Sequence, residues 1–137
     1  MKVYLDTSVL VSLIVADANS GRAENLSEVV TDPVTSVWTT VEVTSALGRR
    51  LRMGALTPAE RDAAEATFEE WLAAAGPALT VTTADYAAAR QYVRRSRLRG
   101  PDALHLAVAA RLDLPIATFD EELAEAARAF GLTALPA

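Results

Sequence analysis

The sequence predicts an α/β fold, in the form of a three-layer α/β/α sandwich around a central parallel sheet of four or five short strands. Two observations support this prediction. Short apolar runs that suit buried strands alternate along the chain with longer stretches of helical pattern, an order typical of parallel sheets covered by helices on both faces. No Pro-, Gly- or Ser-rich linker divides the 137 residues, so we expect a single domain over residues 1–137.

The expected strands are the short apolar runs that are bounded by polar residues or proline. In chain order they cover residues 3–5, 34–38, 79–81 and 115–119, with a last edge strand at 132–135.

The expected helices lie between these runs, and capping residues mark several of their ends. Thr39-Thr40 is expected to cap a helix that ends near Met53, with Gly54 in the C′ position. Thr57-Pro58-Ala59-Glu60 is a capping box with proline at the first helical position. Thr83 is expected to cap a helix that ends near Gly100-Pro101. In chain order the helices run to residue 16, over 23–30, to 53, from 58 to 76, from 83 to about 100, over 102–113 and over 121–130.

The composition restricts the available chemistry to oxygen ligands. The chain has no cysteine, one histidine (His105) and one lysine (Lys2). These counts exclude disulfides, thiolate metal sites, a cysteine nucleophile and a site with several histidines. The phosphate-binding loop and dinucleotide-binding sequence patterns are also absent. Eighteen carboxylates and the hydroxyls remain.

The charge is negative overall but unevenly distributed. A protein that simply coats nucleic acid would be basic, whereas this chain has a net charge of −5. Eight arginines nevertheless form two groups, at 49–52 and 90–99, which could contact a polyanion locally or could lie on solvated helix faces. The longest apolar run, at 9–16, is too short to span a bilayer, and the opening residues, which reach a carboxylate at Asp6, lead us to expect no signal peptide. We therefore expect a cytoplasmic protein.

Four carboxylates lie where an expected element begins beyond a strand or a turn. Asp6 and Asp120 directly follow strands, Glu42 lies in the first turn of a helix, and Asp102 opens a helix. Because sites in parallel sheets form at the carboxyl ends of the strands, we expect these acids on one rim. A single acid of this kind is usually a helix cap, but four at equivalent places indicate a site.

Carboxylates gathered on one rim would repel one another, and each pKa would rise unless a cation were bound. Mg²⁺ and Mn²⁺ prefer carboxylate and water oxygens. One or two such ions would suit the in-line attack of water on a phosphodiester. The sequence therefore predicts a site for Mg²⁺, with Mn²⁺ as an alternative, and phosphodiester hydrolysis as the reaction.

Four sequence motifs that contain these acids resemble the motifs of PIN-domain ribonucleases, and in particular those of VapC-type toxins of bacterial toxin–antitoxin pairs. The motifs are LDTSVL at 5–10, VEVTSAL at 41–47, PDALHLA at 101–107 and ATFD at 117–120. They occur in the family's order and cover nearly the whole chain.

The resemblance implies a PIN-like fold in which Asp6, Glu42, Asp102 and Asp120 form an acidic, catalytic metal site. It makes Ser8 and Thr118 supporting hydroxyls. It also implies Mg²⁺ or Mn²⁺ as cofactor, RNA cleavage that leaves 5′-phosphate and 3′-hydroxyl ends, a homodimer, and a small antitoxin as partner. Glu121, beside Asp120, could share the role of its neighbour.

Other residues carry two readings each. His105 could bond a site carboxylate, but a packing role is favoured because one buried histidine is common. Phe68, Trp71 and Leu72 fall at helical spacing and indicate core or dimer surface rather than base stacking. The candidates for RNA binding are the arginines next to the Asp102 motif, namely Arg94, Arg95, Arg97 and Arg99.

Two rival functions are less consistent with the sequence than a nuclease. A phosphoaspartyl phosphatase needs a second aspartate two residues after the first and a lysine to balance the phosphate, but position 8 is Ser8 and the only lysine is Lys2. A receiver domain is disfavoured in the same way, because it also needs a lysine. A catalytically silent PIN-like domain that binds RNA or protein would be marked by the loss of site acids, and none is lost.

Overall fold

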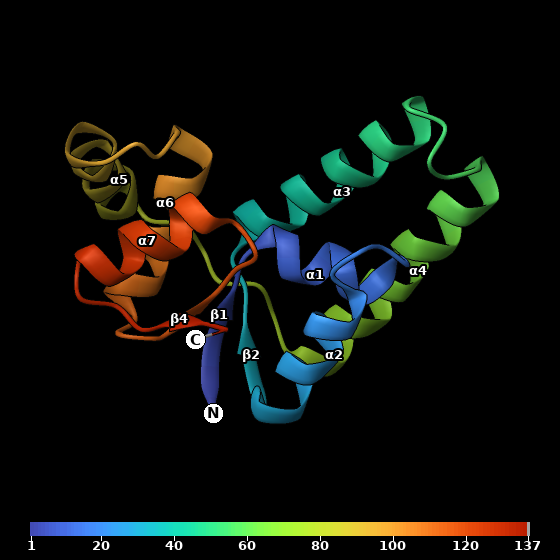
Figure 1. Ribbon diagram of the computed structural model, residues 1–137, viewed down its shortest axis with the longest axis horizontal. Helices are drawn as coiled ribbons and strands as arrows, with labels where there is room; N and C mark the ends of the chain where they lie inside the picture. The colour runs from blue at the N-terminus through green and yellow to red at the C-terminus, as the bar shows by residue number, and fades with distance from the viewer. Residues whose placement is uncertain (137) are drawn as a thin grey trace.

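The structure, a computed structural model that describes residues 1–136, contains four parallel strands and seven helices (Figure 1). The strand order is β2-β1-β3-β4. In chain order the elements are β1 (Lys2–Leu5), α1 (Thr7–Ile14), α2 (Ser20–Val29), β2 (Asp32–Val34), α3 (Val37–Arg52), α4 (Pro58–Ala75), α5 (Thr83–Arg95), α6 (Gly100–Arg111), β3 (Ile116–Ala117), α7 (Glu121–Ala129) and β4 (Ala134–Leu135). The predicted three-layer α/β/α fold with a parallel sheet is confirmed.

The two faces of the sheet carry separate hydrophobic clusters. Successive side chains of a strand point to opposite faces, and in β1 this alternation sends Tyr4 into one cluster and Val3 and Leu5 into the other. The Tyr4 cluster includes residues of α5, α6 and α7, whereas the second cluster includes residues of α1 to α4. Figure 1 shows these two groups of helices on opposite sides of the sheet. On the side of α1 and α2, the helices α3 and α4 project together away from the sheet.

The aromatic residues of α4 belong to the second cluster. Phe68 is 4% exposed, Trp71 stacks against it at 6.3 Å between ring centroids, and Leu72 packs beside them. Of the two predicted roles, core or dimer surface, the core role is confirmed for Phe68, and the partly buried Trp71 and Leu72 pack against that core. Among residues 1–136, no helix combines the length and the apolar character that crossing a membrane requires.

The second strand and the start of α3 lie earlier in the chain than predicted. The strand covers Asp32–Val34 rather than 34–38, and α3 begins at Val37 with Ser36 as its N-cap rather than Thr39 or Thr40. Ser36 and Thr39 form a reciprocal capping box. The hydroxyl of Tyr4 reinforces it with a hydrogen bond of 2.9 Å to Ser36, a contact from β1 that the local sequence does not display.

The predicted strand at 79–81 is wrong, because only Leu79 pairs there. It forms one isolated bridge to Ser36, with hydrogen bonds from its N–H to Thr35 and from the N–H of Val37 to its carbonyl. The helix predicted from 83 to about 100 is divided. It ends at Arg95, where the Ser96 hydroxyl donates to the carbonyl of Tyr92 and accepts from the N–H of Leu98. A new helix then begins at Gly100.

The central strands are short, and they end side by side. β3 covers only Ile116–Ala117 and β4 only Ala134–Leu135, within the longer runs that were predicted. Leu5 of β1 pairs with Ala117 of β3, and the N–H of Asp6 donates to the carbonyl of Ala117 at 3.1 Å. This register places the segments after the two strands, with Asp6 on one and Thr118 on the other, next to each other at the carboxyl edge of the sheet.

Candidate active site

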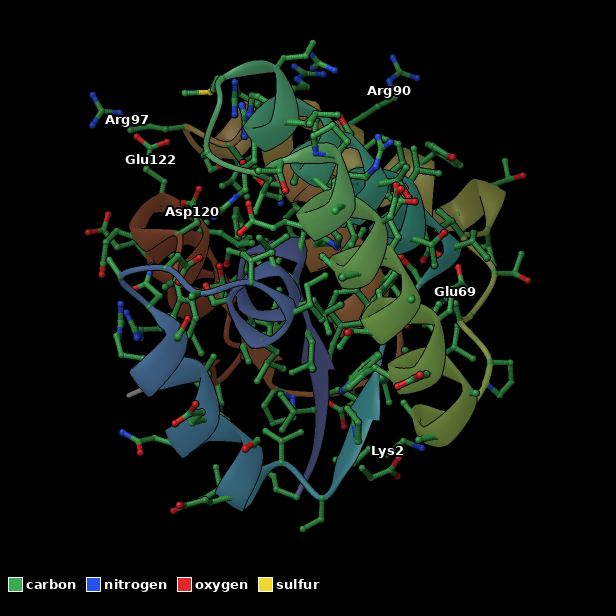
Figure 2. All side chains as sticks on the ribbon, turned by 90° about the vertical axis from the view of Figure 1, so that its right-hand side faces the viewer. Lys2, Glu69, Arg90, Arg97, Asp120 and Glu122 are labelled. Carbon is green, nitrogen blue, oxygen red and sulfur yellow. The ribbon has the colours of Figure 1, made fainter. Side chains whose placement is uncertain are left out.

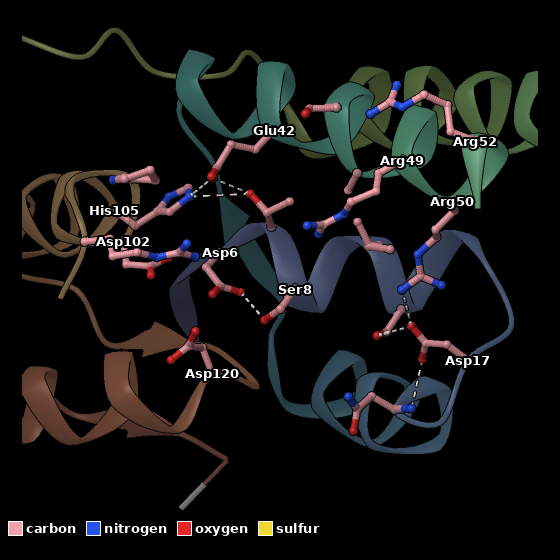
Figure 3. A pocket seen from close by; sticks show the side chains of 18 residues that line it. Asp6, Ser8, Asp17, Glu42, Arg49, Arg50, Arg52, Asp102, His105 and Asp120 are labelled. Carbon is pink, nitrogen blue, oxygen red and sulfur yellow. Dashed lines mark hydrogen bonds and ion pairs between the residues drawn. The ribbon is translucent and has the colours of Figure 1, made fainter. Parts of the chain in front are cut away.

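A cavity of about 520 Å³ lies at the carboxyl edge of the sheet and brings together the four predicted acids (Figure 3). Asp6 comes from the end of β1, Glu42 from α3, Asp102 from the first turn of α6, and Asp120 from the start of α7. Residues separated by more than a hundred positions therefore share one cavity, as the rule for parallel sheets predicts.

Asp6 is buried and held by three donors. Its carboxylate accepts hydrogen bonds from the hydroxyls of Ser8 and Thr118, both at 2.6 Å, and from the N–H of Val9 at 3.3 Å. The last of these bonds makes Asp6 the N-cap of α1. Burial raises the pKa of the Asp6 carboxyl above its ordinary value, although the nearby His105 and the hydroxyl donors oppose the shift.

Asp120 is held by the same pair of hydroxyls and caps the next helix. Its N–H donates to the hydroxyl of Thr118 at 3.0 Å, and the hydroxyl of Ser8 accepts from the N–H of Phe119. The Asp120 carboxylate accepts from the N–H of Leu123 at 2.9 Å and so caps α7. Ser8 and Thr118 thus tie Asp6 to the backbone of the segment that carries Asp120. The neighbouring Glu121 is exposed and does not line the cavity.

Glu42 lies in a hydrogen-bond network that reaches into the core. It is in the second turn of α3 and not, as predicted, in the first, because the helix begins at Val37. Its carboxylate accepts from the hydroxyl of Thr7 at 2.8 Å and from Nε2 of His105. Burial would raise the pKa of Glu42, but the hydrogen bonds and the proximity of His105 outweigh it and lower the pKa.

His105 and Tyr4 form the inner part of this network. Nδ1 of His105 lies 2.7 Å from the hydroxyl of Tyr4, which in turn bonds Ser36. Both side chains are almost fully buried, at 1% and 0% exposed. The preference for a packing role of His105 needs correction, because the ring also contacts a site carboxylate. Its spacing of three residues from Asp102 on α6 was the signal in the sequence, since side chains three apart share a helix face.

The pKa of Asp102 is raised by its surroundings in the cavity. It lies in the first turn of α6, three residues after the N-cap Arg99, so it does not itself open the helix as predicted. Burial raises the pKa of Asp102 to about 6, and repulsion from Asp120, Asp6 and Glu42 acts in the same direction while His105 opposes it. The other three carboxylates are thus close enough to Asp102 to disfavour its charged form.

The donor chemistry of the cavity fits a hard divalent cation with a partly hydrated shell. Among residues 1–136, no three histidine, aspartate or glutamate side chains lie close enough together to hold a metal ion by themselves. Mg²⁺ commonly keeps several waters and takes only one or two protein carboxylates, with substrate phosphates in the remaining positions. The raised pKa of Asp102 is the physical reason that a cation would be favourable here.

Arginines line the cavity, but mostly not the ones predicted. Of the four candidates only Arg99 lines it. Arg94 borders a separate groove, and Arg95 and Arg97 are exposed. Figure 2 shows Arg97 extending outward from the body of the molecule. The other arginines of the cavity are Arg49, Arg50 and Arg52 of α3, which the sequence marked as a cluster but did not connect to the acids.

Comparisons with known proteins agree with this geometry. The profile of the PIN domain family matches residues 3–129. Two curated relatives from Mycobacterium tuberculosis strains, Ribonuclease VapC45 and Ribonuclease VapC49, are each 34% identical over 139 residues, covering 98% of this chain and 95% of theirs.

Solved structures show the same fold. M. tuberculosis VapC20, described as a sarcin-ricin loop cleaving toxin, superposes with a TM-score of 0.74 at 22% identity and covers 96% of both chains. FitAcB from Neisseria gonorrhoeae superposes with a TM-score of 0.72 at 20% identity, covering 98% of this chain and 96% of the other.

Proposed function

The chain belongs to the PIN-domain family and resembles its VapC ribonucleases along its whole length, and from this membership we propose that it is a divalent-metal-dependent endoribonuclease. In this proposal it acts in the cytoplasm as the toxin of a toxin–antitoxin pair. One observation supports it most directly. Four carboxylates from four separate segments line a single cavity, and the pKa of one of them is raised to about 6 by burial and by the others.

In this proposal some carboxylates of the cavity bind the metal ion, and another accepts a proton. A bound Mg²⁺ or Mn²⁺ would supply charge neutralisation and a water of lowered pKa. We propose that Asp6, fixed by Ser8 and Thr118, Asp102 and Asp120 hold the ion, one or two of them directly and the rest through its water shell. Glu42, kept ionised by Thr7 and His105, can accept a proton from the attacking water. Attack on phosphorus then breaks the bond to the 3′ oxygen, which takes up a proton and leaves a 3′-hydroxyl and a 5′-phosphate.

An RNase assay on the purified protein tests this proposal. We expect cleavage of single-stranded RNA with Mg²⁺ or Mn²⁺, none in EDTA, and at least about a 100-fold loss in Asp6→Asn, in line with the loss of one charge-stabilising group. The matched control is Asp62→Asn, which changes an exposed carboxylate of α4 that pairs only at the surface.

Two results of the assay would contradict the proposal. Metal-independent cleavage that leaves 2′,3′-cyclic phosphate ends would exclude the mechanism. RNA binding without cleavage in either metal would favour the alternative, a catalytically silent PIN-like domain that binds RNA or protein.

We further propose that two copies associate through a second, apolar groove. The groove measures about 570 Å³ and lies between the start of α3, α5 and α6, with Trp38, Ala89 and Leu104 among its lining residues. Tyr86 and Val93 at its edge are 55% and 40% exposed. Exposing these apolar side chains to water is unfavourable, and a partner surface that covered them would remove this free-energy cost. Analytical ultracentrifugation should give roughly twice the 14.6 kDa of one chain, and a single-chain mass at micromolar concentration would refute the dimer.

The antitoxin partner is proposed from the family together with the charge of the cavity. The rim formed by Asp6, Glu42, Asp102 and Asp120 is anionic. An arginine of the antitoxin placed among these carboxylates would match their charge and compete with the metal. An apolar helix of the antitoxin, packed between helices away from the groove that we assign to the dimer, would supply most of the affinity.

A further inference from the structure

One stripe of α3 links the acidic end of the cavity to its basic end. Glu42, Ala46, Arg49 and Arg52 follow one another at intervals of three or four residues, and all line the cavity. Side chains at these intervals share one helix face. With a rise of 1.5 Å per residue, Arg49 lies about 10 Å and Arg52 about 15 Å along the helix from Glu42. Figure 3 shows the arginines along α3, away from the group formed by Asp6, Asp102 and Asp120.

Three of the cavity's arginines have no acidic partner. Within the described residues 1–136, Arg49, Arg52 and Arg99 form neither an ion pair nor a side-chain hydrogen bond to a carboxylate. Arg50 differs, because its Nη2 lies 3.2 Å from Asp17, whose carboxylate also accepts from Ser12 and from the N–H of Asn19. Arg50 therefore fastens α3 to the loop between α1 and α2, whereas the other three guanidinium groups are available to an anion.

We propose that Arg49 and Arg52, together with Arg99 at the start of α6, bind the RNA phosphates that flank the scissile one. The inference rests on the proposed function, since the carboxylates mark where the bond is cut. A strand that crosses the carboxylates then continues along α3 toward its C-terminal end. Guanidinium groups suit this task because they contact phosphate oxygens in pairs and keep their charge at any physiological pH.

The geometry places the RNA backbone on α3 rather than on α5. Arg90 and Arg94 of α5 line the apolar groove, not the cavity that holds the acids. A strand bound there would lie away from the carboxylates. Arg99 alone connects the sequence-predicted tract 94–99 to the cavity.

RNA-binding measurements by fluorescence anisotropy test the assignment. The probe is a labelled single-stranded RNA, and the buffer contains EDTA so that cleavage does not compete. The affinity is measured at several salt concentrations. Each phosphate contact to single-stranded nucleic acid contributes about 0.7 to the slope of log affinity against log salt. We expect Arg49→Gln and Arg52→Gln each to weaken binding several-fold and to lower the slope by about 0.7. Arg49→Lys should keep the slope, and the matched control Arg128→Gln, on α7, should bind like the wild type.

Three results would contradict the assignment of Arg49 and Arg52 to RNA binding. Wild-type affinity and slope in the double variant Arg49→Gln/Arg52→Gln would overturn it. So would a lowered slope in Arg94→Gln/Arg95→Gln with none in the α3 variants, or failure of the wild-type protein to bind the probe. Thermal melts confirm that each variant is folded. The proposed function fails separately, if the wild type binds RNA through Arg49 and Arg52 but cleaves none in Mg²⁺ or Mn²⁺.

Discussion

Asp6 shows how one side chain can serve both the fold and the site. Its carboxylate caps α1 and also occupies the cavity, with Ser8 and Thr118 fixing both of its oxygens. Asp120 caps α7 in the same way. The alternatives of helix cap and site acid therefore coexist at these two residues. Asparagine retains the capping ability, so Asp→Asn variants separate the charge from the cap.

We expect the negative charge of Asp102 to lower the free energy of unfolding. Its pKa is about 6 in the folded protein against an ordinary value of 3.8, so folding favours its protonated form. The stability linked to this group is complete below about pH 4, declines as the pH rises toward 6, and is lost above it. Asp102→Asn lacks this decline. In EDTA the variant should therefore be more stable than the wild type at pH 7.5, by about 1–2 kcal/mol after allowance for solvent screening.

Urea unfolding of Asp102→Asn and wild type at pH 4 and pH 7.5 measures this difference. The difference in free energy of unfolding between the variant and the wild type should be small at pH 4. At pH 7.5 it should become smaller when Mg²⁺ is added to the wild type. A marked loss of stability in the variant at both pH values would show that the fold needs the Asp102 carboxylate.

At the scale of single residues, the sequence was sufficient for the acids and insufficient for their partners. Asp6 and Asp120 follow apolar runs, and that position alone predicted their place on the rim. The contact between His105 and Glu42 joins two helices 63 residues apart, and the contact between Tyr4 and His105 joins a strand to a helix across 101 residues. Contacts of this kind depend on tertiary packing, which local spacing does not specify.

Among the helices, α5 is fixed to its neighbour by an ion pair between a buried carboxylate and a partly exposed guanidinium group. Asp85, 1% exposed, accepts from Arg111 of α6 at 2.8 and 3.0 Å. It also completes the capping box of α5 through the N–H of Thr82. Burial alone would raise the pKa of Asp85, but the bonds from Arg111 and Thr82 outweigh it and lower the pKa. The pair thus ties the start of one helix to the end of the next.

Asp85→Asn should destabilise the protein by about 2 kcal/mol at pH 7, because the charged partner of two hydrogen bonds is removed. The folded pKa is lowered, so the stabilisation is present above the unfolded pKa and is lost as the pH falls through the folded one. The difference from wild type should accordingly vanish in strong acid. Asp62→Asn, which removes an exposed pair on α4, should change the free energy of unfolding by less than about 0.5 kcal/mol. Equal effects of the two variants in urea unfolding would contradict the assigned role of Asp85.

Two element boundaries followed from local caps, and a third local cap was missed by one residue, since α5 is capped by Thr82 rather than Thr83. The capping box at Thr57 and Glu60 begins α4 where the sequence indicates. Gly54 follows α3 with a φ of 76°, a conformation that glycine adopts without strain. The start of α3 lies earlier than predicted, because Ser36 caps the helix and is held by a hydrogen bond to Tyr4 of β1. The run at 79–81 does not form a strand of the sheet, because only Leu79 pairs with another residue.

For the molecule as a whole, the order of strands and helices was sufficient to predict the fold. Alternation along the chain gave the parallel sheet, and the sheet gave a common edge for Asp6 and Asp120. The groove between α3, α5 and α6 and the placement of the arginines could not be foreseen, because they depend on how whole helices pack.

The proposed toxin activity makes a prediction for the cell. Expression of the wild-type protein alone should arrest bacterial growth, and co-expression of the small protein encoded beside it should relieve the arrest. Asp6→Asn, which retains the cap but removes the charge, should permit normal growth at equal protein levels, measured by culture density and immunoblot. If Asp6→Asn arrests growth as strongly as the wild type, the toxicity does not come from this cavity and the nuclease proposal falls.

The direction of β1 has a practical consequence for biochemical work. The one lysine of these 137 residues, Lys2, begins the strand, and Asp6 follows its end, so the only side-chain amine lies at the sheet edge opposite the cavity. Lys2 is exposed. Amine-reactive dyes or resins would therefore attach there and leave the cavity open to solution. A protein coupled in this orientation can report on ligands without a tag near the acids.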